Sequence, residues 1–136
     1  MGCDIHLHVE IMVKGEWLHY NHPHLGRDYA LFGKMAGVRG WSEPIAEPRG
    51  LPADATKTTR LDYQHYGTDA HTPSWLNMRE IARLERWFTK ENPDADFEEN
   101  WGYLFGNGFA GFLTTDDPDA YPQELEDVRF VFWFDN

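Results

Sequence analysis

Four ionisable side chains alternate along the start of the chain. Asp4, His6, His8 and Glu10 occupy every second position, and apolar residues fill the positions between them. Side chains of a β-strand alternate between its two faces, so the spacing predicts a strand over residues 1–11. One face of that strand is apolar, and the other carries two carboxylates and two imidazoles. Because imidazole both binds divalent metals and exchanges protons near neutral pH, we predict a site on this face.

Two kinds of chemistry suit these four residues. In the first, His6, His8 and Asp4 bind one divalent ion, Zn or Mn, with the carboxylate completing or orienting the ligand shell. In the second, His6 and His8 act as acid and base, and Asp4 and Glu10 orient them. The alternative without chemistry is a pair of histidines that are hydrogen-bonded under a loop.

The segment Asp4-Ile5-His6-Leu7-His8 has the Asp-x-His-x-His form and resembles the first strand of amidohydrolase-like metal-dependent hydrolases. In those enzymes the two histidines bind one divalent ion. The resemblance covers five residues, and 136 residues are too few for the eight-stranded barrel of those enzymes. It therefore implies the metal chemistry and not the fold.

The charge of the chain is distributed unevenly. The net charge is −11, yet residues 26–60 have a net charge of +2 and residues 61–136 a net charge of −11. An acidic chain is not expected to bind a nucleic-acid backbone, whereas a small anion would be drawn to the cationic segment. Seven residues are candidates for ligand binding. Three are arginines of this cationic segment, three others precede a predicted helix, and one is an arginine of the last strand: Arg27, Arg39, Arg49, His71, Ser74, Trp75 and Arg129. Each candidate also has an interpretation without a ligand: the arginines would pair with nearby acidic residues, Ser74 would be a turn residue, and Trp75 would pack in the core.

The pattern of the remaining chain predicts the elements that position these residues. A hairpin around Gly15 returns through residues 17–20 and brings His19 and His22 towards His6 and His8. Helices are predicted over residues 27–38, over 56–66, and from an N-cap at Asn77 to Asn92-Pro93. Residues 40–60 contain three prolines and predict a long ordered loop, and residues 101–112 predict strand or loop. Residues 128–134 are apolar on both faces and predict a central strand beside the first one.

These elements predict a single α+β domain over residues 1–136. We expect an antiparallel sheet of about four strands with two main helices on one side. The chain has one cysteine, no apolar run of membrane-spanning length and no signal peptide, so we expect a cytoplasmic protein that does not contact membranes.

Several segments together resemble one protein family. They are Met1-Gly2-Cys3-Asp4-Ile5-His6, Arg27 to Phe32 with Ala36 to Arg39, Pro44 to Pro52, His71 with Ser74-Trp75-Leu76, and Arg129 to Asn136. They are similar to small proteins of tailed phages and bacteria that begin Met-Gly-Cys-Asp-Ile-His. The resemblance assigns no catalytic residue. It implies a setting, because short phage proteins often act in the host cytoplasm against defence systems that use nucleotide signals.

Three functions are compatible with these observations. The first is a hydrolase of a phosphorylated, nucleotide-like small molecule, with a His/Asp site that is assisted by a metal or works without one. The second is a sponge that sequesters the same kind of ligand without chemistry, with formation of a homo-oligomer helping to close the site. The third is an acidic protein that inhibits a host enzyme through its surface.

Overall fold

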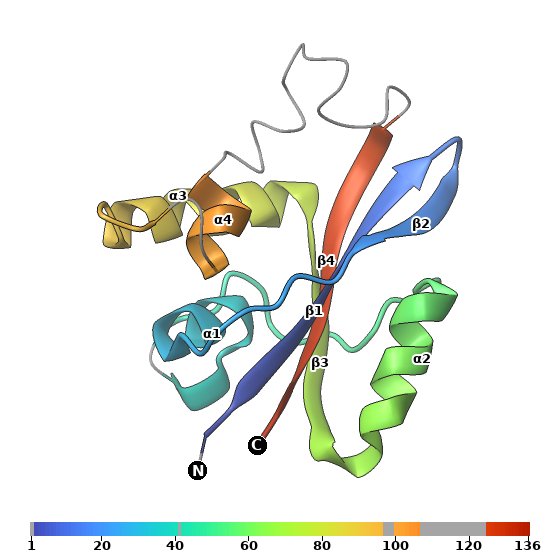
Figure 1. The fold of residues 1–136 in the computed structure, drawn as a ribbon, viewed down its shortest axis with the longest axis horizontal. Helices are drawn as coiled ribbons and strands as arrows, with labels where there is room; N and C mark the ends of the chain where they lie inside the picture. Colours follow the sequence, from blue (N-terminus) through green and yellow to red (C-terminus); the bar gives the residue numbers. More distant parts are fainter. Residues whose placement is uncertain (1, 41, 97–99, 107–124) are drawn as a thin grey trace.

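A four-stranded antiparallel sheet in the order β2-β1-β4-β3 runs through the middle of the protein (Figure 1). The computed structural model describes residues 2–40, 42–96, 100–106 and 125–136. The strands are β1 (Asp4–Val13), β2 (Glu16–Asn21), β3 (Ala70–Asn77) and β4 (Leu125–Asp135). The α+β class, the N-terminal hairpin and the pairing of the last strand with the first are as predicted.

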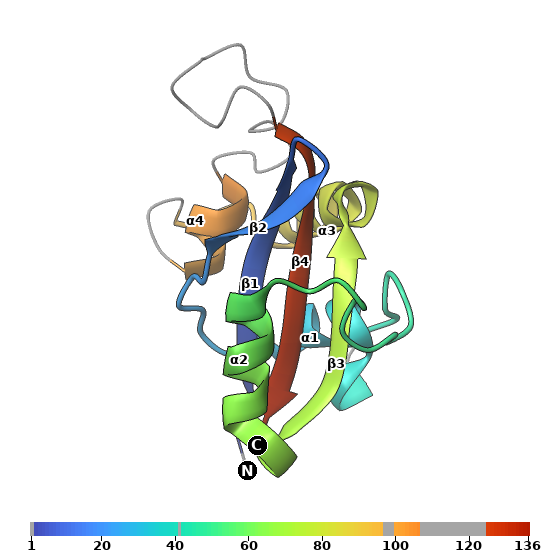
Figure 2. The same ribbon diagram turned by 90° about the vertical axis from the view of Figure 1, so that its right-hand side faces the viewer.

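The apolar face of β1 forms the core together with one face of β4. Ile5, Leu7 and Val9 lie opposite Phe134, Phe132 and Phe130 in the register of the two strands. These side chains are covered by α1 (Tyr29–Ala36), α3 (Met78–Glu91) and α4 (Asn100–Gly106), which lie together on one side of the sheet (Figures 1 and 2). The fully buried members of β4 make it the central strand that the sequence predicted.

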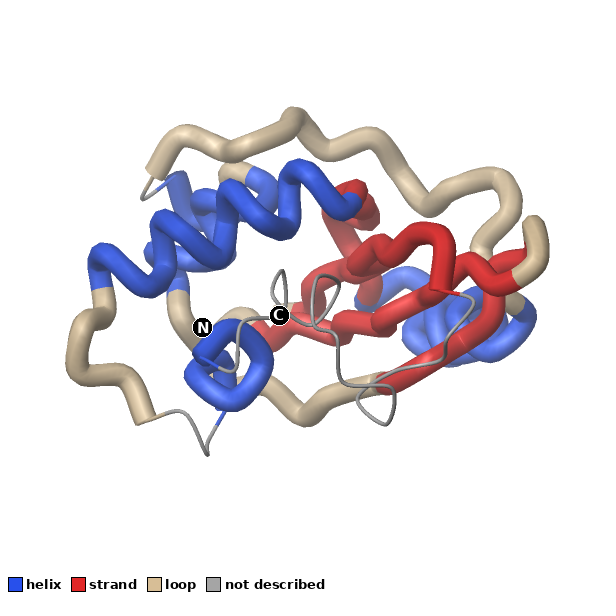
Figure 3. The backbone as a smooth tube through the Cα atoms, turned by 90° about the horizontal axis from the view of Figure 1, so that it is seen from above, coloured by secondary structure: helices blue, strands red, loops and turns tan. Residues whose placement is uncertain are grey.

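Helix α2 (Lys57–Tyr66) lies on the opposite face of the sheet (Figures 2 and 3). The sequence predicted a short helix over residues 56–66, and the two main predicted helices, α1 and α3, lie together on one side of the sheet as expected. The sequence did not predict that α2 takes the opposite face. The physical reason is polarity. Thr59 is the only buried residue of α2, and a helix with so few apolar side chains cannot cover an apolar sheet face. It covers instead the face that carries Asp4, His6, His8 and Glu10.

Two elements of local structure differ from the sequence analysis. Residues 70–77, for which the sequence predicted no strand, form strand β3. Pro73 argues against a strand in the sequence, because proline cannot donate a hydrogen bond to a neighbouring strand. However, β3 is an edge strand whose pairing is irregular between His71 and Ser74, and edges and bulges tolerate proline. Residues 100–106, within a segment expected as strand or loop, form α4, whose Trp101 and Phe105 are buried against the core. Residues 107–112 of that prediction lie outside the described part of the chain.

The caps of the helices follow the predicted chemistry. The Asp28 carboxylate accepts a hydrogen bond from the backbone N–H of Leu31, and Gly37 ends α1 in the left-handed conformation. Asn77 and Glu80 form a reciprocal capping box at the start of α3. Two short 3-10 turns, Val38–Gly40 (η1) and Gly67–Asp69 (η2), follow α1 and α2. Among the described residues, no helix has the length and apolar character that crossing a membrane requires.

A buried ion pair ties α2 to the sheet. Glu10 is completely buried, and one of its carboxylate oxygens accepts from the N–H and hydroxyl of Thr56 and from the hydroxyl of Thr59. The other oxygen accepts from Arg129 Nε at 2.7 Å. Burial alone would raise the pKa of Glu10, but these hydrogen bonds outweigh it and hold the pKa below its ordinary value. Arg129 also donates to Asp54 and stacks on Trp17.

We expect Glu10→Ala to lower the free energy of unfolding by about 3–5 kcal/mol, because it removes the only buried counter-charge of Arg129 among the described residues and leaves the guanidinium with the exposed Asp54 alone. Urea unfolding followed by tryptophan fluorescence measures the change. Glu16→Ala, at an exposed position of β2, is the matched control and should change stability by less than about 0.5 kcal/mol. Equal losses in the two variants would show that the ion pair does not hold α2 in place.

Candidate active site beside the first strand

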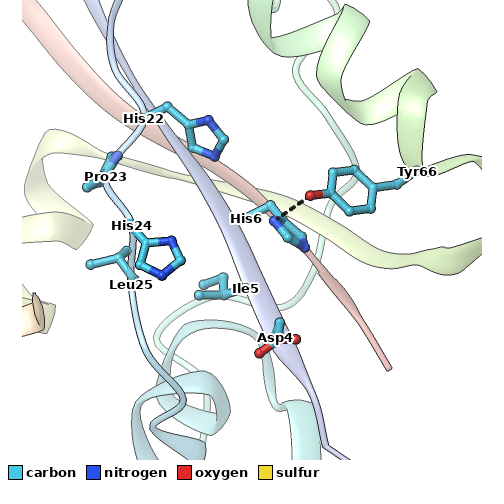
Figure 4. A pocket seen from close by; sticks show the side chains of 8 residues that line it. All are labelled: Asp4, Ile5, His6, His22, Pro23, His24, Leu25 and Tyr66. Carbon is cyan, nitrogen blue, oxygen red and sulfur yellow. Dashed lines mark hydrogen bonds between the residues drawn. The ribbon is translucent and has the colours of Figure 1, made fainter.

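A pocket of about 470 Å³ opens along the first half of β1 (Figure 4). It lies between the polar face of the strand, the C-terminal end of α2 and the segment that follows β2. Its lining residues are Asp4, Ile5, His6, His22, Pro23, His24, Leu25 and Tyr66. Pockets of this size bind small molecules rather than polymers, and three imidazoles in the lining give it acid–base and metal-binding character.

His6 stands between a carboxylate and a phenol. Its Nε2 contacts Asp135 Oδ2 across the β1–β4 pair, and its Nδ1 lies 3.1 Å from the Tyr66 hydroxyl (Figure 4). An ionised carboxylate only accepts, so Nε2–H of His6 donates to Asp135, and Nδ1 accepts from the Tyr66 hydroxyl. Burial raises the pKa of Tyr66, which keeps its hydroxyl protonated at neutral pH. Tyr66, His6 and Asp135 thus form one hydrogen-bonded chain that reaches the pocket.

His8 lies one step further along β1 and is fully buried. Its Nε2 lies 2.7 Å from Asp62 Oδ2, and its Nδ1 lies 2.8 Å from His19 Nε2. Burial lowers the pKa of His8 to about 4, so the ring is neutral at pH 7. Burial also lowers the pKa values of His19 and His22. A neutral imidazole is the form that binds a metal ion.

His8, His22 and Asp62 could hold a metal ion. Each offers one ligand atom, and the three atoms lie within 4.8 Å of one another. Zinc bonds of about 2.0–2.2 Å place tetrahedral ligand atoms roughly 3.3 Å apart. The distances from Asp62 Oδ2 to His8 Nε2 (2.7 Å) and to His22 Nε2 (3.9 Å) lie on either side of that value. Three ligands leave a coordination position open, as catalytic zinc sites require, and His22 also lines the pocket.

The Trp133 indole forms the floor beneath both histidines. It stacks on His8 with 5.3 Å between ring centroids and lies 6.0 Å from His6, while Tyr63 and Tyr66 cover it from α2. Its Nε1 is buried without a hydrogen-bond partner among the described residues. Apolar ring surface around the imidazoles lowers the local dielectric, which strengthens every charge interaction at the site.

The four predicted catalytic residues do not form one cluster, because each contacts different partners. His6 and His8 face the same side, as predicted, but each has its own carboxylate, Asp135 and Asp62. Asp4 lines the pocket and pairs with Arg27, whose hydrogen bond lowers the Asp4 pKa. Glu10 belongs to the buried ion pair with Arg129. Among the described residues, the group that could hold a metal ion is His8, His22 and Asp62, rather than the predicted set of His6, His8 and Asp4.

Most of the predicted ligand-binding residues lie away from the pocket. Arg49 stacks on Trp75 with 3.8 Å between its Cζ and the ring centroid, donates to the Trp75 carbonyl and pairs with Glu80. His71 and Ser74 lie opposite Phe134 and Phe132 in the strand register, which places them on the core face. There His71 contacts Asn136 and Thr72, and the Ser74 hydroxyl accepts from the Arg49 N–H.

Two of the other three predicted arginines also lie away from the pocket. Arg39 lies over the Tyr29 ring beside α1, and Arg129 is buried in its pair with Glu10. Arg27 alone of the four arginines reaches the edge of the pocket, through its exposed ion pair with Asp4. The prediction that the arginines of residues 26–60 bind a ligand rested on the net positive charge of that segment. In the structure their guanidinium groups contact other residues of the chain instead.

Sequence reasoning missed the contribution of α2. Asp62 and Tyr66 both reach the histidines, and neither was a candidate. The signal was present, since Thr59, Asp62, Tyr63 and Tyr66 follow helical spacing and form a polar stripe opposite the polar face of β1. The expected approach of His19, His22 and Asp135 to the histidines is confirmed by the contacts above.

No protein-family model, curated protein or solved structure gives a significant match to this chain. The chemistry of the site is therefore argued from its own residues.

We expect Arg49→Ala to lower the free energy of unfolding by about 2 kcal/mol, because Arg49 contributes charge-assisted hydrogen bonds and a cation–π contact at the start of α3. Thermal and urea unfolding measure the loss. Arg79→Ala, at the exposed second position of the same helix, is the control and should change stability by less than about 0.5 kcal/mol. A stable Arg49→Ala protein would contradict this structural role and return Arg49 to the set of candidate ligand-binding residues.

Proposed function

We propose that this protein is a small hydrolase that acts on a phosphorylated, nucleotide-like molecule with the help of one divalent metal ion. His8, His22 and Asp62 would bind the ion, and Tyr66, His6 and Asp135 would move the proton. One observation carries the proposal: the three-ligand cluster reaches the pocket through His22, and the Tyr–His–Asp chain reaches the same pocket through His6 and Tyr66.

The cluster suits a catalytic ion better than a structural one. A zinc or manganese ion would polarise the phosphate and lower the pKa of a bound water. His8 is held rigidly for this role, because His19 engages its second nitrogen and Trp133 stacks on its ring. His22 is the most exposed of the three ligands, with 42% of its side chain accessible, so the cluster is open towards solvent on that side.

The Tyr66–His6–Asp135 chain provides a route for one proton. In hydrolysis a water oxygen bonds to phosphorus, the bond to the leaving oxygen breaks, the water loses a proton and the leaving oxygen gains one. His6 Nδ1 accepts the Tyr66 proton as the Tyr66 oxygen takes that of the water. Asp135 stabilises the resulting imidazolium, and the proton then returns to the leaving oxygen by the same route.

The proposed substrate class follows from the size and lining of the pocket. A volume of about 470 Å³ accommodates a nucleotide-sized ligand. Arg27 is exposed at the pocket edge, and a solvent-exposed ion pair is weak enough for its guanidinium to turn from Asp4 to a phosphate. The resemblance to small phage proteins adds a setting, in which degradation of a nucleotide signal in the cytoplasm would counter host defence. If the site binds this ligand without cleaving it, the protein is a sponge.

We expect the metal-free protein to bind one Co²⁺ or Zn²⁺ ion per chain, with the visible absorption of the cobalt form showing the geometry of the site. Asp62→Ala and His22→Ala should abolish this absorption. His24→Ala is the control, because His24 lines the same pocket outside the cluster and should leave metal binding intact. Binding that survives loss of Asp62 or is lost with His24 would contradict the assigned ligands.

We expect the zinc or manganese form to release product from a panel of phosphomonoesters, phosphodiesters and cyclic nucleotides. Tyr66→Phe and Asp135→Asn should each lower kcat by at least about 100-fold, because general acid–base catalysis contributes about 10²–10⁴. His65→Ala, at an exposed position beside Tyr66, is the control and should retain activity.

Two results would overturn the hydrolase. An unchanged kcat in Tyr66→Phe would remove the proton route. A metal-loaded protein that gains thermal stability from a nucleotide and returns it intact would be the sponge instead.

A further inference from the structure

Helix α3 carries a row of positive charges on an otherwise acidic protein. Arg79, Arg83, Arg86 and Lys90 are separated by four, three and four residues, so they lie on one stripe of the helix. Residues 61–136 contain five lysines and arginines in all, and the fifth is the buried Arg129. The cations of the C-terminal half are thus collected on one helix face rather than spread among its sixteen acids.

These four side chains are exposed and have no carboxylate partners in the described residues. All four positions are solvent-exposed, and no ion pair joins them to a described acid, whereas Arg27, Arg49 and Arg129 are each paired. The nearest acid of the helix start, Glu80, is taken up by Arg49 and the capping box. The row is therefore available for a partner outside the chain.

Such a row is unfavourable for the isolated helix. Like charges four residues apart, as in Arg79 with Arg83 and Arg86 with Lys90, destabilise a helix, and salt-bridged alternation would be the stabilising choice. A further cation flanks the row, because the Lys34 ammonium of α1 lies 5.7 Å from the centroid of the Trp87 ring. Binding of an anionic partner would remove this repulsion.

We propose that the α3 face binds the phosphate backbone of a nucleic acid. The row extends about 16 Å along the helix axis, at 1.5 Å per residue. This length spans roughly five phosphates of one DNA strand, at 3.4 Å of rise each. A nucleic acid always presents such a regular row of single negative charges, which few protein surfaces do. Three of the four cations are arginines, whose planar fork matches a phosphate bidentately.

The charge distribution determines how the polymer can approach. The net charge of −11 predicts that the protein does not bind a nucleic-acid backbone. That prediction assumes that the charge is spread evenly over the surface. Helix α3 lies on the side of the sheet opposite α2 (Figures 1 and 2). The pocket is lined by Tyr66 of α2 and by residues of β1 and the segment after β2. An approaching backbone is therefore repelled by the rest of the chain and held in one orientation by α3. The contact is independent of the pocket and of the proposed hydrolysis.

The test is binding of fluorescein-labelled 20-base-pair DNA and of the corresponding single strand, measured by anisotropy at low salt with a chelator present. Arg83→Glu/Arg86→Glu should lower the affinity for duplex at least tenfold. Lys57→Glu/Arg60→Glu, which makes the same charge change at exposed positions of α2, should change it less than twofold. Contacts to four phosphates give a slope of log K against log salt of roughly −3.6, and the α3 variant should show less than half of it.

The other outcomes overturn the proposal in distinguishable ways. Equal losses in the two variants would indicate a response to net charge alone. Polyglutamate that displaces the DNA at an equal concentration of charges would assign the face to an acidic protein. No binding by the wild-type chain would leave the row without a nucleic-acid partner. Tyr66→Phe should bind DNA as the wild type does, so failure of the hydrolase leaves this test unaffected.

Discussion

The structure depends on the burial of an ionisable strand face. β1 pairs on both sides, and α2 covers its polar face, so the buried His8 and Glu10 must find partners or lose solvation at a large cost. Glu10 is satisfied completely, by two threonines and Arg129, and it anchors α2 over the strand. An apolar helix in the place of α2 would leave these groups unsatisfied. The composition of α2 is therefore a consequence of the polar face that it covers.

The burial of this strand face also gives His6 and His8 different environments. Towards the Glu10 end, His8 is sealed between Trp133, His19 and Asp62, which keeps it neutral and fixed. Towards the chain termini, His6 borders the pocket and keeps a hydrogen bond to Tyr66. A gradient of exposure along four strand positions thus gives one repeated pattern different environments: Glu10 is a buried anchor, His8 is a buried neutral imidazole, and His6 borders the pocket. The proposed hydrolysis rests on these environments.

The opposite side of the protein follows a different rule. α1, α3 and α4 bury apolar stripes against the phenylalanines of β4, and the outer surface of α3 is left without a structural task. Its cations are not needed for packing, and their collection on one stripe opposes helix stability. The two proposed activities therefore lie on the two faces of one sheet, and neither depends on the other for its geometry.

The alternation of Asp4, His6, His8 and Glu10 with apolar residues was enough to predict the first strand and its reactive face, because side-chain direction in a strand has a period of two. Helix caps, the hairpin and the central β4 were also determined locally, by residues within a few positions of one another. The ligand set was decided only by the tertiary structure. Asp62, Tyr66 and Asp135 reach the histidines from 54, 60 and 129 residues away, and Arg49 finds Trp75 and Glu80 instead of the pocket. Such pairings depend on which face of the sheet each helix covers, and that choice is made by the complementarity of whole surfaces rather than by any local pattern.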